Sequence, residues 1–169
     1  MKKIIDMQRQ RRNKRRYTLH FDDGSWLGLF DELVIKYDLK VDKEVNSKEI
    51  EELAAEDDKK KAMNLGIRYL GYRSRSENEM VVYLRGKGFD ESIIAKTIDK
   101  LESYGYIDDR AFARDWIRSR LNSKPMGKAM IKIELIQKGI AEDIIEESLG
   151  TIDESIEIEK AREVALKFE

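Results

Sequence analysis

The chain has 169 residues, of which 41% are hydrophobic and 40% charged, with one His and no Cys. This composition excludes disulfide bonds and thiolate metal ligands, and a single His makes a zinc site a poor fit. With no apolar run of about 18 residues and no signal-peptide core, we expect a cytoplasmic protein.

The net charge of −1 hides a strong segregation of charge along the chain. Residues 1–20 carry a net charge of +7, residues 21–60 of −7, residues 61–138 of +6 and residues 139–169 of −7. Blocks of opposite sign predict separate faces for separate partners.

The N-terminal part predicts a small β unit. Residues 15–21 alternate apolar and polar side chains, as in a half-exposed strand, and residues 26–30 give a second strand. Gly24, in the turn between them, accepts the positive φ that a tight hairpin needs. Residues 3–7 can add a third strand, and we expect strands only before about residue 31.

Two short helices are expected after these strands. Asp31 can cap the first helix, which ends near Leu39. Asn46 and Glu49 have the spacing of a capping box, so a second short helix is expected over about 47–55.

From about residue 58 the apolar spacing is helical. Lys87-Gly88 and Lys138-Gly139 lie 51 positions apart in the same frame, and each glycine suits the left-handed position that ends a helix. Caps and glycine stops predict helices over about 59–73, 76–87, 90–104, 109–122, 127–138 and 141–149.

The predicted fold class is therefore mainly α, with tandem three-helix repeats in an elongated array after a small N-terminal β-hairpin unit. Residues 155–169 read as the first helix of a further repeat. The expected domains are the β-hairpin unit with its short helices (1–57), repeat 1 (58–106), repeat 2 (107–152) and the start of an incomplete repeat 3 (153–169).

Three blocks of the helical part resemble one known family. They read YRSRSENEMVVYLRGKGF (72–89), YGYIDDRAFARDWIRSR (104–120) and IKIELIQKGIAEDII (131–145). In order and separation they are similar to motifs of the RecX family, regulatory proteins of the bacterial RecA recombinase. The resemblance covers about 60–150, and the basic N-terminus is similar to the extension of Gram-positive members. It implies a regulator without enzymatic activity that binds in the groove of the RecA–DNA filament and restrains ATP hydrolysis, strand exchange and coprotease action.

Basic side chains recur at helical spacing in repeat 2, and concentrated cations attract phosphate or an acidic protein face. A solvated surface is the competing interpretation. The candidates for binding the RecA filament or DNA are Arg73, Arg75, Arg110, Arg114, Arg118, Arg120, Lys124, Lys128 and Lys132. A secondary candidate is the N-terminal basic run of Arg11, Arg12, Lys14, Arg15 and Arg16, whose alternative is a flexible solubilising arm.

No residues are assigned to catalysis, metal binding or a cofactor. Asp108 and Asp109 fit a helix N-cap followed by an acid in the first turn. His20 fits a solvent-facing strand position, and Trp26 and Trp116 fit apolar stripes of the core.

Two main function classes remain open. The first is a negative modulator of RecA, a monomer that touches DNA weakly or through the filament. The second is a direct nucleic-acid-binding helical repeat protein. The helix over 109–122 begins with Asp109 and Arg110, which read base edges poorly, and acidic blocks flank the basic one. Composition leaves a third class, a structural adaptor, open as well.

Overall fold

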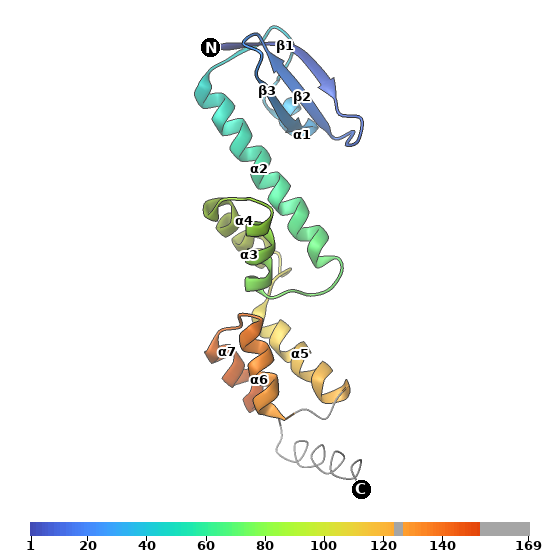
Figure 1. The fold of residues 1–169 in the computed structure, drawn as a ribbon, viewed down its shortest axis with the longest axis vertical. Helices are drawn as coiled ribbons and strands as arrows, with labels where there is room; N and C mark the ends of the chain where they lie inside the picture. Colours follow the sequence, from blue (N-terminus) through green and yellow to red (C-terminus); the bar gives the residue numbers. More distant parts are fainter. Residues whose placement is uncertain (124–126, 153–169) are drawn as a thin grey trace. The chain divides into compact units, whose positions relative to one another are not determined.

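The computed structural model describes residues 1–123 and 127–152 of the chain. They form two compact units, a β unit over residues 1–62 and a helical unit from residue 63 onward. Figure 1 gives the order of the elements along the chain. Within the described ranges, no helix is long and apolar enough to span a bilayer.

The β unit is built on a four-stranded antiparallel sheet with the order β3-β2-β1-β4. Helix α1 packs on the sheet, and the start of α2 adds Leu53 to the core, beside Ile4, Leu19 and Leu29. The elements are β1 (Lys2–Arg9), β2 (Arg16–Phe21), β3 (Trp26–Phe30), α1 (Asp31–Lys36) and β4 (Glu44–Val45).

The predicted hairpin is confirmed, and so is the third strand. Gly24 has a φ of +82° in the turn between β2 and β3. The period of two is also visible in the burial of β2, where Leu19 and Phe21 are buried and His20 between them is partly exposed.

Three details of the β unit differ from the predictions. Strand β4 lies after residue 31, because Glu44 and Val45 pair with β1 across a long connection. Asp31 is the first residue of α1, whereas Phe30 takes the N-cap position. Trp26 is 68% exposed, since Leu29 takes the core side of β3 and alternation turns Trp26 to the other face.

Helix α2 (Ser47–Leu70) is one continuous helix where two were predicted. Its capping box is confirmed, because the Glu49 N–H donates to Asn46 and the Asn46 N–H donates to Glu49, at 2.8 and 2.7 Å. No Gly or Pro interrupts residues 47–65, and Ala, Glu and Lys favour helix throughout. The predicted boundary between the β unit and repeat 1 therefore falls inside a helix.

The helical unit contains the two predicted three-helix repeats, and the predicted fold class is confirmed. Repeat 1 joins the end of α2 to α3 (Glu77–Gly86) and α4 (Glu91–Ser103). Repeat 2 consists of α5 (Asp109–Ser123), α6 (Lys128–Gln137) and α7 (Glu142–Gly150). The predicted helix over 155–169 lies outside the described residues.

The helix ends of the two repeats follow the sequence closely. Ser76 and Glu79 form the predicted capping box of α3, and Asp90 caps α4 through the Ile93 N–H at 2.9 Å. Gly88 and Gly139 end the middle helices with φ of +87° and +75°. Both glycine predictions are therefore confirmed.

Each repeat has its own apolar interior. Met80, Leu84 and Leu101 are fully buried in repeat 1. Repeat 2 encloses a single cluster in which Ile131, Leu135 and other residues are fully buried, with Trp116 packed against it as predicted. The buried members of this cluster are Phe112, Ala113, Ile117, Ile131, Leu135, Ile140, Ile145, Leu149 and Ile152.

Polar contacts join the two repeats within the helical unit. The buried Ser76 hydroxyl donates to the backbone oxygen of Lys138 at 2.6 Å, and the Lys138 ammonium donates to Glu79 at 2.9 Å. At the same junction the Glu77 N–H donates to Asp109 at 2.8 Å. Repeat 2 is therefore held on the N-terminus of α3 by hydrogen bonds and charge.

Candidate partner-binding surface

The predicted cations of repeat 2 are positioned by helix α5. Asp108 caps this helix by accepting the Ala111 N–H at 2.9 Å. Phe112, Ala113 and Ile117 face the buried cluster, which fixes the rotation of the helix. Arg114 and Arg118 follow one another at a spacing of four and are exposed on its outer face.

Arg114 and Arg118, here named the α5 arginine pair, are the predicted cations of α5 that remain open to a partner. Among the described residues, the Arg114 side chain makes no hydrogen bond or ion pair. The Arg118 guanidinium lies 3.7 Å from Asp115 and its side chain is 74% exposed, so that ion pair is weak.

The α5 arginine pair borders a cleft of about 240 Å³. Its other lining residues combine an apolar floor with two hydroxyl groups, and they are Ile117, Leu121, Ser148, Thr151 and Ile152. Two cations beside an apolar floor suit a protein surface that carries both acidic and apolar side chains.

Other predicted cations of repeat 2 have close acidic partners. Arg110 forms an ion pair with Glu147, and Lys132 forms ion pairs with Glu142 and Glu146, all on α7. These contacts reduce the positive charge that the basic block offers to a partner.

Lys128 and Lys124 complete the predicted stripe. The Lys128 ammonium donates to the backbone oxygen of Ile152 at 3.3 Å and has further interactions. Lys124 lies outside the described residues.

Arg120 belongs to the packing of repeat 2. Its Nε donates to Glu134 at 2.6 Å, and its guanidinium lies 4.5 Å from the ring centroid of Trp116. The Trp116 indole N–H also donates to Glu134, at 2.7 Å. Burial raises the pKa of the Glu134 carboxyl, but these two hydrogen bonds outweigh it and hold the pKa below its ordinary value.

The predicted arginines of repeat 1 are also held by neighbours. Arg73 donates two hydrogen bonds to Glu79, at 2.8 and 3.0 Å. Arg75 stacks 3.8 Å from the ring centroid of Tyr69, which itself stacks on Tyr83 at 4.0 Å. The Nε of Arg75 is buried and has no hydrogen-bond partner among the described residues.

Glu79 is the centre of the junction between the repeats, a role that the sequence indicated only as a capping box. Burial raises the pKa of its carboxyl, but hydrogen bonds from Arg73 and Lys138 dominate and lower the pKa to about 2. Glu79 therefore stays ionised and holds residues of both repeats.

Asp109 has a role that sequence reasoning missed. It was predicted as an acid in the first turn of α5, which it is, but it also accepts the Glu77 N–H at the start of α3. Burial raises the pKa of its carboxyl. The sequence pattern around Asp108 and Asp109 did not predict this contact, because Glu77 lies 32 residues earlier in the chain.

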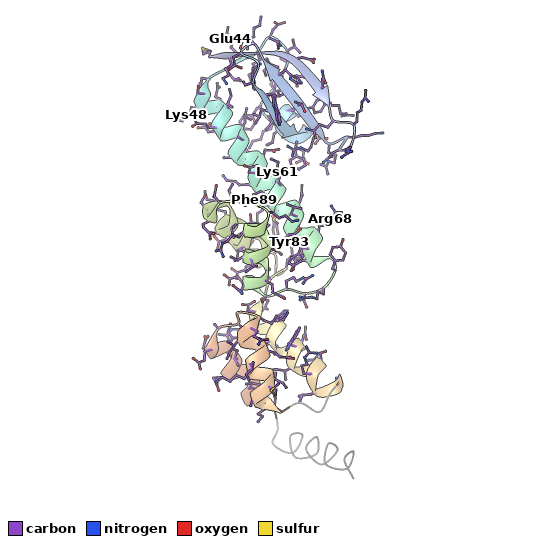
Figure 2. The ribbon with its side chains drawn as sticks, in the orientation of Figure 1. Glu44, Lys48, Lys61, Arg68, Tyr83 and Phe89 are labelled. Carbon is purple, nitrogen blue, oxygen red and sulfur yellow. The ribbon has the colours of Figure 1, made fainter. Side chains whose placement is uncertain are left out.

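The basic run begins in the connection between β1 and β2 and ends with Arg16, the first residue of β2. Arg15 pairs with Glu32, and Arg16 pairs with Asp57 at 2.8 Å, where Asp57 is 1% exposed. Figure 2 shows long side chains extending from this end of the hairpin. Arg11, Arg12 and Lys14 are exposed, so the structure divides the run into paired and open cations.

The described part of the chain holds no group of three His, Cys, Asp or Glu residues suited to a metal ion. Asp108 and Asp109 are both occupied as acceptors of backbone N–H groups. A second cleft, of about 440 Å³, lies at the repeat junction, and Asp108 and Asp109 are among its lining residues.

Two family models match the helical unit. The model described as "RecX, first three-helix domain" matches residues 62–101, and "RecX, second three-helix domain" matches residues 108–149. Both matched ranges coincide with the repeats seen in the structure.

Whole-chain comparisons agree with these models. The chain is similar to "Regulatory protein RecX" of Clostridium tetani, with 34% identity across 98% of this chain and 76% of that protein. A solved structure, "Crystal structure of regulatory protein RecX", has a TM-score of 0.77 at 29% identity and covers 99% of this chain and 82% of that one. "Crystal structure of RecX from Lactobacillus salivarius" has a TM-score of 0.64 at 32% identity, over 66% and 72% of the two chains.

Proposed function

This chain belongs to the RecX family of regulatory proteins, and on that premise we propose that it is a negative modulator of RecA. It binds in the groove of the filament that RecA forms on DNA, and it slows ATP hydrolysis and strand exchange there. The family supplies the partner, and the helical unit supplies the contact surface.

The observation that carries the proposal is the open α5 arginine pair within the second RecX domain. Neighbouring cations of this repeat are bound to acids of α6 and α7, whereas Arg114 has no such partner and Arg118 has only a distant one. Two cations beside an apolar cleft favour a composite partner of protein and phosphate. Phosphate can bind the cations, but only a protein partner has apolar side chains that can pack on the apolar floor.

Direct binding of naked DNA by the repeats is the alternative function. The helical unit argues against it, because Arg110, near the start of α5, is paired with Glu147 and so is poorly placed to read base edges. Acidic side chains of α7 also lie beside Lys132, where they repel phosphate.

The test is the DNA-dependent ATPase of RecA, measured against the concentration of this protein. Reversing both charges in Arg114→Glu/Arg118→Glu should weaken inhibition by about tenfold or more, since each reversal replaces an attractive contact with a repulsive one worth about 1 kcal/mol. Lys128 is left unchanged because it contacts the backbone of Ile152.

The matched control is Lys59→Glu/Lys96→Glu, which changes net charge equally at exposed sites on α2 and α4. Circular dichroism should show unchanged helix content for both variants. Full inhibition by the Arg114→Glu/Arg118→Glu variant would remove the α5 arginine pair as the contact. Absence of any effect of the unaltered chain on RecA would contradict the proposed function itself.

A further inference from the structure

The β1–β2 hairpin carries an unusually concentrated positive charge. Six Lys and Arg residues lie within positions 9–16, and no acidic residue occurs between Asp6 and Asp22. Both RecX family models begin after this hairpin, at residues 62 and 108, so they assign it no role.

The end of this hairpin is a structured turn, which argues against the flexible arm. The Gln10 N–H donates to the Arg16 oxygen at 2.9 Å, and the Arg16 N–H donates to the Asn13 oxygen at 3.0 Å. The Asn13 side chain accepts the Arg15 N–H at 3.1 Å, which closes an Asx turn. The backbone that carries the cations therefore has a defined shape.

The cations of the hairpin fall into two groups, those that contact other residues of the β unit and those that are exposed without such contacts. Arg15 and Arg16 pair with acids of the β unit, Glu32 and Asp57, and so anchor the base of the turn. Arg9 stacks 5.2 Å from the ring centroid of Tyr17 on the neighbouring strand.

Arg11, Arg12 and Lys14 are exposed, and their side chains make no hydrogen bond or ion pair with another described residue. We name these three residues the hairpin tip. Holding three like charges close together on an ordered turn costs free energy unless an anionic partner offsets the repulsion.

We propose that the hairpin tip binds the phosphate backbone of DNA. A row of phosphates can contact several cations of one turn at once, and the release of condensed counterions favours the complex. A two-stranded β-ribbon also has the width to enter the major groove of a duplex. The contact is sequence-independent, because phosphates carry no base information.

An acidic protein surface is the competing partner, and the hairpin tip fits it less well. Arg11 and Arg12 carry guanidinium groups that can bind carboxylates in a bidentate way, but no acid among the described residues holds them in a fixed orientation for such pairing. For phosphate, the number of charges matters more than their geometry.

This contact does not require RecA, so it is measured with the full chain and naked DNA. The probe is a short fluorescein-labelled duplex, with the same strand alone as a second arm, titrated between about 50 and 200 mM salt. Arg11→Gln/Arg12→Gln/Lys14→Gln should weaken duplex binding about tenfold at the lower salt and reduce the slope of log K against log salt by about 2 to 3 units. On the single strand the loss of slope should be about 2 units.

Two matched variants make the result decisive. Lys48→Gln/Lys59→Gln/Lys96→Gln removes the same net charge from exposed sites elsewhere, with Lys48 seen in Figure 2 at the start of α2, and should leave the slope nearly unchanged. Arg11→Lys/Arg12→Lys keeps the charge and should keep the slope, because counterion release depends on charge.

Equal slopes for the tip variant and the unaltered chain would overturn the proposal. So would a tip variant that binds naked DNA normally but no longer regulates RecA, since the tip would then serve a protein partner. Failure of the RecA assay alone leaves this DNA measurement intact, so the two proposals are tested separately.

Discussion

Replacing Gly139 by Ala should destabilise the helical unit more than the same replacement at Gly88. Both glycines have positive φ, at +75° and +87°, and end the middle helix of a repeat. Their surroundings differ. A Cβ on Gly88 would meet open space, whereas a Cβ on Gly139 would lie 2.5 Å from Cγ and 2.6 Å from Nδ2 of Asn78 in the other repeat.

The free-energy cost of Gly139→Ala has two parts, the strain of the left-handed backbone and the overlap with Asn78. The left-handed backbone costs an Ala roughly 1 kcal/mol at either position. At Gly139 the overlap with Asn78 adds about 1–3 kcal/mol, as in overpacked cores, so the total is about 2–4 kcal/mol. Because Asn78 lies on a helix and its own Cβ is involved, a rotamer change does not relieve the overlap.

Thermal and urea unfolding followed by circular dichroism measure the difference. Each kcal/mol should lower Tm by about 2–4 °C in a chain of this size. A Trp26→Phe background leaves Trp116 as the fluorescent reporter of repeat 2, because Trp26 is the other Trp and lies in the β unit. Asn78→Gly removes the obstructing atoms and should recover the excess loss in Gly139→Ala, but not the loss in Gly88→Ala.

Equal destabilisation by Gly88→Ala and Gly139→Ala would refute this reasoning. It would mean that the repeats separate at little cost and that the close approach at Asn78 contributes nothing. A double-mutant cycle of Asn78→Gly with Gly139→Ala that shows no coupling would lead to the same conclusion.

Three further predictions concern carboxylates that are buried or partly buried. Asp57→Ala should destabilise the β unit by about 3–5 kcal/mol in urea unfolding, because Arg16 would be left partly buried without its partner; a loss under about 1 kcal/mol would contradict this. Glu79 has a folded pKa of about 2, below the unfolded value of 4.5, so its stabilising contribution is complete above pH 4.5 and is lost as the pH falls toward 2. Glu79→Gln should therefore lower Tm at pH 7 and show a shallower decline over that acid range, and an unchanged profile would count against the junction. Asp109→Asn should raise Tm at pH 7, because burial disfavours the charged carboxyl while the amide oxygen still accepts the Glu77 N–H; Asp109→Ala, which loses that bond, should lower it.

The sequence predicted part of the candidate surface. The spacing of Arg114 and Arg118 placed them on one face, and the structure agrees because both are exposed and border the same cleft. The sequence could not separate this pair from Arg110, Arg120 and other cations, because their partners on α6 and α7 lie 14 and 37 residues away along the chain. Whether a cation is free to bind a partner depends on the residues that lie near it in space.

Local chemistry by itself determined five of the six repeat helices (α3 to α7), most of their caps and their glycine stops, but not the start of the first helix of repeat 1, which is the end of the continuous α2. Ser76 with Glu79, Asp90, Gly88 and Gly139 act on backbone groups within a few residues, so their roles are encoded where they stand. The Lys-Gly repeat at 51 positions likewise predicted two copies of one unit.

Tertiary structure alone decided which polar residues connect distant segments. Asp57 holds β2 to α2, Asp109 caps a helix of the other repeat, and Gly139 must remain small because Asn78 lies beside it. Tertiary packing also turned Trp26 outward and paired β4 with β1. These contacts join residues 32 to 61 positions apart. No local pattern predicts them, because each contact forms only once the chain has brought both partners together.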